Sequence, residues 1–374
     1  MRKFVLLGLF GLFILAFSAA PAVMRTALAL EPIDSTGLQV VNGRDVPPQG
    51  AKQYEADHRH TPAIRVKPGE KFVIMTEDNT DGQFLVDGHY KIVPKWDLEV
   101  FQHNPMNANP SAGPIYIEGC TKNDVIAVHI HSVKPEAEGY TARYPNDVKE
   151  ASLLRKYPQL DPPSIHPIKH LSGPSGTTRD GVAVYGKYKW DLDPYIGTLT
   201  LAPEREVQSF LLVRGPYGGN FDVRDFRQGS TVYLNSYNEG GLLYAGDCHA
   251  SQADTEYHGL ADECRSEYVL SCEIIKNKRL PHARIKTRDG RLVGLCENGF
   301  TQEAIGEARL NLFDWLVEEY GCDPADLYAL MAAAEPFKVE FYQGPGPGAS
   351  WGVQTLGVSV PESFILGKGW KRTP

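Results

Sequence analysis

The sequence predicts a mainly β protein with a smaller α/β part and two helices near its C-terminus. Many short runs rich in Val, Ile, Tyr and Phe are separated by Gly, Pro, Asn and Asp, which is typical of strands and turns. Helical spacing and helix-start residues appear late, between residues 299 and 334. Short strands followed by helices favour a β-rich fold with a separate α/β part, which we place at residues 276–374.

The first 29 residues have the pattern of a secretory signal peptide. Arg2 and Lys3 precede an apolar run at residues 4–20, and Ala27-Leu28-Ala29 is a small-x-small cleavage site. The alternative is an uncleaved membrane anchor, because the run is close to the shortest spanning length. We expect a secreted or periplasmic protein, residues 30–374, that has no membrane contact once the signal is cleaved.

The net charge and the cysteine content limit the kinds of binding partner and of cross-link that we expect. The formal net charge is −8, and nucleic-acid binding requires a basic surface, so we expect no nucleic-acid partner. The chain has 6 cysteines, and none lies in a CxxC spacing. An exported protein could pair them as disulfides, but the sequence does not choose among the pairings.

The β-rich part, residues 30–275, contains several predicted strands. Alternating or apolar runs place them at residues 63–66, 71–77, 113–119 and 125–133. In the last of these, His129 and His131 share one face, close enough to bind one metal ion. We favour the alternative, that both are ordinary hydrogen-bonded histidines, since histidine is often partly buried.

Residues 134–193 differ from the chain around them. They contain many prolines and charges, including Asp161-Pro162-Pro163. We expect an insertion that is mostly loop, with one short helix at residues 146–156.

Residues 214–256 organise the prediction of function. Polar clusters lie at both ends of this stretch, Gly218-Gly219-Asn220-Phe221-Asp222 and Gly246-Asp247-Cys248-His249. Strands are expected at residues 230–237 and 242–245, with the glycines at 240 and 241 supplying a hairpin turn. Such a hairpin would bring the two clusters together, as in a hydrolase or a metal site.

The chain after this stretch returns to regular structure. A strand is expected at 266–275, a hairpin with an Asp-Gly turn at 283–296, and a final strand at 358–365. Thr301 can cap a helix that ends before Gly321, and Asp323 with Pro324 begins a second helix through Ala334. The apolar stripe of the first helix is core packing.

The order of the motifs resembles the acetamidase/formamidase family of amide hydrolases over most of residues 60–335. The matching segments are Asn109-Pro110, Gly113-Pro114, Glu118-Gly119, Ile196-Gly197, Ala202-Pro203, residues 218–222 and, above all, Gly246-Asp247-Cys248-His249-Ala250 with Gln252 and Glu256. The resemblance implies modules of β-sandwich or barrel type. It also implies an amidase that cleaves the C–N bond of a small linear amide, such as formamide or acetamide, and a homo-oligomer.

Amide hydrolysis needs an activated water, a group that polarises the carbonyl and a proton donor for the leaving nitrogen. Asp247 and His249 are two apart on a strand end and so share a face. Together with Asp222 they could bind a divalent metal ion, zinc or calcium. We expect Glu256, with Asp247 and His249, to be catalytic.

Substrate contacts are expected from Asn220 and Gln252. The alternative for Asn220, Asp222 and Asp247 is that they are ordinary turn residues. Cys248 should face the core, because it alternates with its neighbours.

Two other functions stay open. At positions 253 and 255 the chain has Ala253 and Thr255, where the family pattern has glycines. Glycine lets backbone approach a ligand closely. Their replacement favours a non-catalytic, extracytoplasmic small-ligand-binding protein on the same scaffold. A metal hydrolase acting on another bond is also compatible with these residues.

Overall fold

Two large sheets form the framework. The computed structural model describes residues 33–93, 108–143, 154–160, 164–256, 259–344 and 353–372. The predicted signal peptide therefore lies outside the described residues. In the part of the chain that the structure describes, no helix is both long and apolar enough to cross a membrane.

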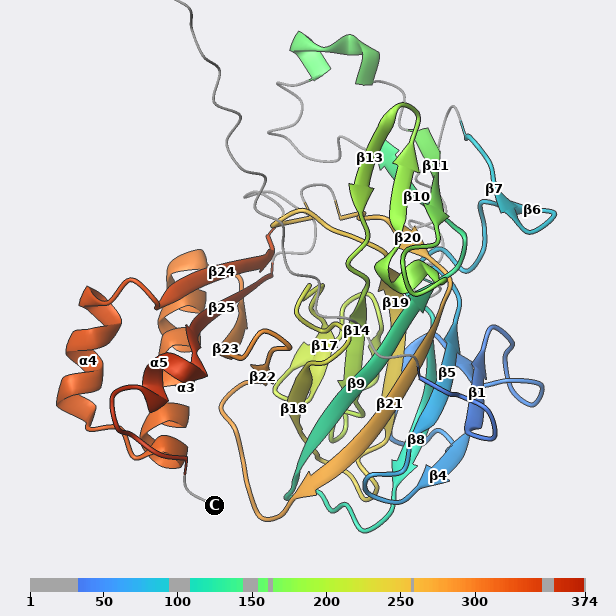
Figure 1. Ribbon diagram of the computed structural model, residues 1–374. Coiled ribbons are helices and arrows are strands. Elements are labelled where there is room, and N and C mark those ends of the chain that lie inside the picture. Colours follow the sequence, from blue (N-terminus) through green and yellow to red (C-terminus); the bar gives the residue numbers. More distant parts are fainter. Residues whose placement is uncertain are drawn as a thin grey trace, which may run out of the picture. The chain divides into compact units, whose positions relative to one another are not determined.

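The first sheet has nine strands (Figure 1). In spatial order they are β1 (Gln39–Gly43), β5 (Phe72–Thr76), β21 (Ser266–Ile275), β9 (Val125–Pro135), β18 (Thr231–Asn235), β22 (Arg284–Lys286), β23 (Arg291–Asn298), β25 (Gln354–Pro361) and β24 (Lys338–Gln343). All neighbouring pairs are antiparallel except β1 with β5.

The second sheet has twelve strands. Its main path is β13 (Tyr188–Asp191), β12 (Val182–Tyr185), β11 (Ser164–Leu171), β10 (Glu138–Arg143), β20 (Glu263–Cys264), β19 (Leu243–His249), β14 (Tyr195–Leu201), β17 (Gly218–Asn220) and β16 (Arg214–Gly215). Beside this path, β8 (Ser111–Ile117) pairs with β19, and β2 (Lys52–Gln53) and β4 (Ile64–Val66) pair with β8.

The remaining elements are short or helical. Two small sheets have two strands each: β3 (Glu55–Ala56) pairs with β15 (Gln208–Ser209), and β6 (Leu85–Val86) pairs with β7 (His89–Tyr90). Helices α3 (Thr301–Tyr320), α4 (Pro324–Ala333) and α5 (Glu362–Leu366) lie near the C-terminus, and 3-10 turns lie at Pro158–Leu160 and Thr178–Asp180.

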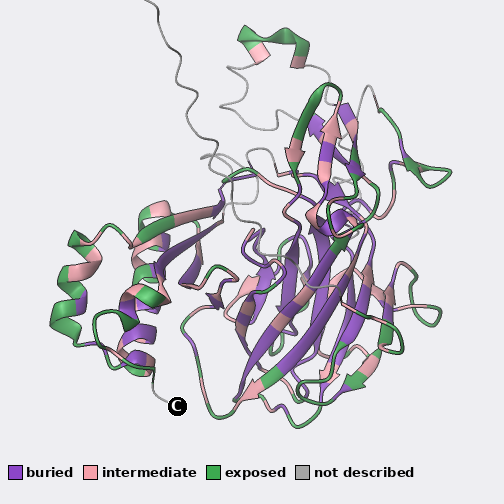
Figure 2. Cartoon of the chain, viewed as in Figure 1, coloured by how far each residue is buried: buried purple, intermediate pink, exposed green. Residues whose placement is uncertain are grey.

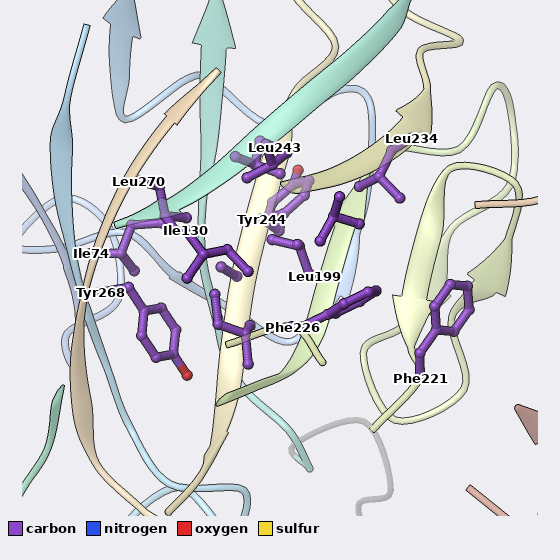
Figure 3. Close-up of a cluster of buried hydrophobic side chains, with 14 of the residues drawn as sticks. Ile74, Ile130, Leu199, Phe221, Phe226, Leu234, Leu243, Tyr244, Tyr268 and Leu270 are labelled. Carbon is purple, nitrogen blue, oxygen red and sulfur yellow. The ribbon is translucent and has the colours of Figure 1, made fainter. Parts of the chain in front are cut away.

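The main core lies between the two sheets (Figure 3). Ile74, Ile130 and Leu270 come from the nine-stranded sheet, and Leu199 and Leu243 come from the twelve-stranded sheet. All are almost completely buried. The alternation of strand side chains explains this arrangement, because every second residue of each strand faces the partner sheet.

Helix α3 covers β23 and β25 and encloses a second core. Ala308, Leu312 and Trp315 pack there with Leu292 and Leu356, as the helical stripe predicted. Gly321 ends the helix in the left-handed conformation, with φ 63°. Helix α4 begins at Pro324, after an Asp323 cap, and buries only Leu327, so that most of its surface is exposed in Figure 2.

The mainly β fold with two late helices is confirmed, but four local predictions are wrong. The strands near residues 230–237 and 242–245 form as β18 and β19, yet they belong to different sheets. The turn between them crosses the sandwich and is not a hairpin. Thr301 does not cap α3 as predicted. Phe300 occupies the N-cap position, and Thr301 Oγ1 donates a hydrogen bond to Gln354 Oε1. The strand expected at 358–365 ends at Pro361 as β25, and helix α5 begins at Glu362.

The fourth wrong prediction concerns residues 134–193. Much of this stretch is strand, because β10 to β13 extend the twelve-stranded sheet. These strands are recognisable only through their partners, since Pro167 interrupts the pattern of β11, and β12 and β13 have only 4 residues each. The predicted helix at 146–156 lies mostly outside the described residues, and only 154–156 are seen to be helical.

His129 and His131 behave as the ordinary alternative predicted. His129 Nδ1 lies 2.9 Å from Thr231 Oγ1, and His131 Nε2 lies 2.8 Å from Ser271 Oγ. The six cysteines, all within the described residues, are buried free thiols, so the disulfides that export would permit are not formed here.

Candidate active site

Four neighbouring strands place four titratable side chains in one row. Tyr140 of β10 lies opposite Glu263 of β20, Glu263 lies opposite His249 of β19, and His249 lies opposite Tyr195 of β14. Directly opposed residues of antiparallel strands share one face of the sheet. The register therefore brings these side chains together, although they are up to 123 positions apart in the chain.

His249 Nε2 is surrounded by four carboxylates. It lies 3.3 Å from Glu263 Oε2, 3.5 Å from Asp247 Oδ1, 3.9 Å from Asp222 Oδ1 and 4.0 Å from Glu256 Oε1. All five side chains are at most 5% exposed. So much buried negative charge is costly unless a cation or protons compensate it.

Three of these carboxylate oxygens have no hydrogen-bond partner in the described structure. They are Asp222 Oδ1, Asp247 Oδ1 and Glu263 Oε2, the atoms of those residues that lie near His249 Nε2. Buried polar atoms in native proteins normally have a partner, and an ion is one common explanation of an exception. Asp222, Asp247 and His249 form one group that could hold a metal ion, and His249, Glu256 and Glu263 form another.

The backbone at the site has an unusual conformation. Asn109, Asp222 and Asp247 all have positive φ values, of 53°, 48° and 57°. Non-glycine residues rarely adopt this conformation, and it clusters at functional sites where the surroundings hold it in place. Gly197 leaves the necessary space: a Cβ atom there would lie 2.8 Å from Asp247 Oδ2 and 2.9 Å from Asp222 Oδ1.

A polar network holds Asp247 in place. Asn109 Nδ2 donates to Asp247 Oδ2 at 2.8 Å and lies 3.1 Å from Asn220 Oδ1. Thr198 Oγ1 donates to Asn220 Oδ1 at 2.7 Å, and Asn220 Nδ2 donates to the Leu211 carbonyl at 3.2 Å. These bonds occupy Oδ2, which leaves Oδ1 of Asp247 free to face His249.

A second network holds the imidazole. His249 Nδ1 lies 2.5 Å from Tyr195 Oη and 3.2 Å from Gln252 Oε1. Tyr195 also donates to Gln252 Oε1, and Gln252 Nε2 donates to the Tyr342 carbonyl at 2.9 Å. A hydrogen bond at Nδ1 leaves Nε2 available as a ligand atom on the carboxylate side.

The electrostatics of the site favour protonation when no cation is bound. Burial raises the pKa of Asp222 to about 7, against the opposing His249 charge. Burial, and then the Asp222 charge, raise the pKa of Glu256 well above its usual value. Burial alone would lower the pKa of His249, but the carboxylates, Glu263 foremost, raise it well above its usual range. The metal-free site therefore retains protons near neutral pH.

The structure brings together the residues that the sequence singled out, and it adds others. Asp222, Asp247, His249 and Glu256 converge as described, and Cys248 faces the core as predicted. The polar atoms of Asn220 and Gln252 are engaged in hydrogen bonds within the protein, so their role as substrate ligands stays a prediction.

Several site residues were not found from the sequence. Glu263, Tyr195 and Thr198 had no local signal, since each is an isolated polar residue in or beside a strand. Asn109 stood in a segment that carried the family resemblance, and this was the one available signal.

A third group, Glu55, Asp57 and His60, could also hold a metal ion by geometry. Its central carboxylate is already paired, because Arg59 donates to Asp57 from both its backbone and its guanidinium. We assign it no function.

Comparison with known proteins identifies the family of this chain. The Acetamidase/Formamidase family model matches residues 45–211 and 213–288, and the chain belongs to this family. Acetamidase of Mycolicibacterium smegmatis is 25% identical over 247 residues, covering 52% of this chain and 58% of that protein. A putative formamidase of Schizosaccharomyces pombe is 25% identical over 260 residues, covering 58% of this chain and 62% of that protein. The matches thus span less than two thirds of these relatives.

The fold likeness extends further than the sequence likeness. The crystal structure of an acetamidase from Bacillus halodurans superposes with a TM-score of 0.71, covering 88% of this chain and 99% of that one at 21% identity. Identity at this level supports the shared fold.

Proposed function

We propose that this protein is an amidase that hydrolyses the C–N bond of a small linear amide, releasing ammonia and a carboxylate. Family membership and the names of the relatives, an acetamidase and a putative formamidase, support the reaction class. The single observation that carries the proposal is the convergence of four buried carboxylates on His249 Nε2. The near-complete burial of these groups favours a small substrate.

Asp222, Asp247 and His249 are the residues that would hold a divalent cation, and their donor set of two carboxylates and one imidazole suits zinc. The unpartnered Asp222 Oδ1 and Asp247 Oδ1 fit this assignment. A cation bound there supplies polarisation of the amide carbonyl and a lowered pKa for the attacking water.

Glu256 is the proposed proton carrier. Its Oε1 atom lies 4.0 Å from His249 Nε2, and burial raises its pKa well above the usual value, which makes its carboxylate a stronger base. It takes a proton from the attacking water and returns one to the leaving nitrogen, so that RCONH₂ and H₂O give RCOOH and NH₃. Tyr195 and Gln252 keep the imidazole oriented throughout.

We also propose that the protein is exported, on the pattern of residues 1–29 alone. The homo-oligomer expected from the resemblance stays a prediction.

The test is ammonia release by purified protein from formamide, acetamide, propionamide and urea, with and without a chelator. Asp247→Asn is the site variant, and Asp254→Asn is its control, because Asp254 is a nearby aspartate whose side chain is 89% exposed. Release abolished by the chelator and by Asp247→Asn, but kept by Asp254→Asn, supports the proposal. Release that survives both would refute the residue assignment. No release from any amide would favour the ligand-binding alternative.

A further inference from the structure

The final residues of strand β24, in the C-terminal part of the chain, reach into the candidate active site. The matched family segments end at residue 288, whereas β24 covers Lys338–Gln343. Gln343, which is 6% exposed, donates from Nε2 to Asp222 Oδ2. Its Oε1 accepts a hydrogen bond from Arg214 Nη2 at 2.6 Å. Gln343 therefore bridges the guanidinium of Arg214 and the carboxylate of Asp222.

The partners of Gln343 leave its amide only one orientation. A carboxylate can only accept hydrogen bonds and a guanidinium can only donate them, so Nε2 must face Asp222 and Oε1 must face Arg214. A neutral amide is the side-chain type that can satisfy both at once. It also keeps the guanidinium from pairing directly with Asp222, which would neutralise that carboxylate.

The backbone around Gln343 is tied to the same loops. The Tyr342 carbonyl accepts from Gln252, and Tyr342 Oη donates to Asp225 Oδ2 at 2.8 Å. Thr255 Oγ1 lies 3.1 Å from the Gly344 carbonyl and 3.0 Å from the Gly344 nitrogen. The end of β24 thus contacts both loops that carry site residues, the one after β17 and the one after β19.

We propose that Gln343 is a positioning residue that holds Asp222 Oδ2, so that the unpartnered Oδ1 faces His249 Nε2 as a metal ligand. This inference rests on the proposed metal-dependent function. Hydrogen-bond partners of metal ligands set ligand orientation, and their loss typically weakens metal affinity by about 10- to 100-fold. In this protein the C-terminal part, outside the matched family segments, supplies that partner.

The test measures zinc affinity of the full mature chain by competition with a chromophoric chelator. Gln343→Leu should weaken zinc binding by about 10- to 100-fold and lower kcat for amide hydrolysis more than it raises KM. Gln354→Leu is the matched control, because Gln354 lies on the adjacent strand β25 and bonds Thr301 outside the site. In an Asp222→Asn background Gln343→Leu should have no further effect on zinc affinity.

A second variant keeps the proposal testable if Gln343→Leu folds poorly. Removing the positive charge in Arg214→Met should strengthen zinc binding if only the long-range repulsion between the guanidinium and the zinc ion matters. The positioning role predicts weaker binding, because Gln343 loses its anchor. Unchanged or stronger binding in both variants would overturn the inference and leave the proposed function intact. A wild-type protein that binds no divalent cation would overturn both.

Discussion

Glu263 lies directly opposite His249 in the antiparallel register of β20 and β19, with its Oε2 atom 3.3 Å from His249 Nε2. Its other oxygen accepts a hydrogen bond from the Ala261 amide at 2.8 Å, which fixes the carboxylate. The row of Tyr140, Glu263, His249 and Tyr195 therefore makes Glu263 a fixed part of the charge environment of the imidazole.

Glu263→Gln should impair the site while preserving its shape. The substitution removes the negative charge that contributes most to raising the pKa of His249. We expect kcat/KM for acetamide or formamide to fall by about 10-fold or more, measured as ammonia release. Glu267→Gln on β21 is the control, since it is a partly exposed glutamate outside the site. Equal activity of both variants would show that Glu263 has no functional part.

Gly197→Ala should displace the two aspartates. The new Cβ would lie 2.7 Å from the Asp247 carbonyl and within 2.9 Å of both site carboxylates. A displacement of about 1 Å at a catalytic group can cost about 10²-fold in rate, so we expect a loss of that order in kcat/KM. Gly306→Ala in α3 is the control, because its Cβ would meet nothing within 4 Å. Full activity of Gly197→Ala would contradict the tight packing described.

The stability of the metal-free protein should depend on pH through Asp222. Its pKa is about 7 when folded and close to the usual 3.8 when unfolded, so the folded state keeps a proton that the unfolded state releases. The contribution of Asp222 to the free energy of unfolding therefore falls as pH rises from about 4 to about 7.

Asp222→Asn lacks this titration and also removes the charge that raises the pKa of Glu256, so both changes weaken the loss of stability with rising pH. Relative to wild type, we expect the variant to gain stability between pH 5 and pH 8, measured by urea unfolding in the presence of chelator. The comparison is made as a difference between the two proteins because His131, whose pKa is lowered to about 4 by burial, contributes an opposite slope to both. A difference that stays constant with pH would contradict the assignment.

Asn311 should stabilise the packing of α3 against the nine-stranded sheet. Its side chain accepts from Arg284 Nε at 2.8 Å and donates to the Ala283 and Leu295 carbonyls at 3.0 and 3.1 Å. Removing it takes the hydrogen-bond partner from Arg284 Nε and one hydrogen bond from each of the two carbonyls. Asn311→Ala should therefore cost about 2–4 kcal/mol in the free energy of unfolding. Arg309→Ala, on the exposed face of the same helix, should cost less than about 0.5 kcal/mol. Equal midpoints in urea would refute this.

Local sequence signals predicted most of the secondary structure and part of the site. Strands such as β5, β9 and β21 are recognisable from their own residues, and so are both ends of α4. Asp247 and His249 were placed together because two residues apart on a strand end share a face. The prediction of strand pairing was wrong. The sequence predicted that β18 and β19 form one hairpin, but they belong to different sheets.

The sequence by itself determined the strand-rich class, the approximate boundaries of α3 and α4, and the motif residues Asp222, Asp247, His249 and Glu256, because these depend on side-chain type and short-range spacing. Only the tertiary structure decided that Glu263 lies opposite His249, that β10 to β13 extend the second sheet, and that Gln343 reaches Asp222 from the C-terminal part. Strand pairing joins residues far apart in the chain, and its register is set by the packing of the whole sheet, which no single segment encodes.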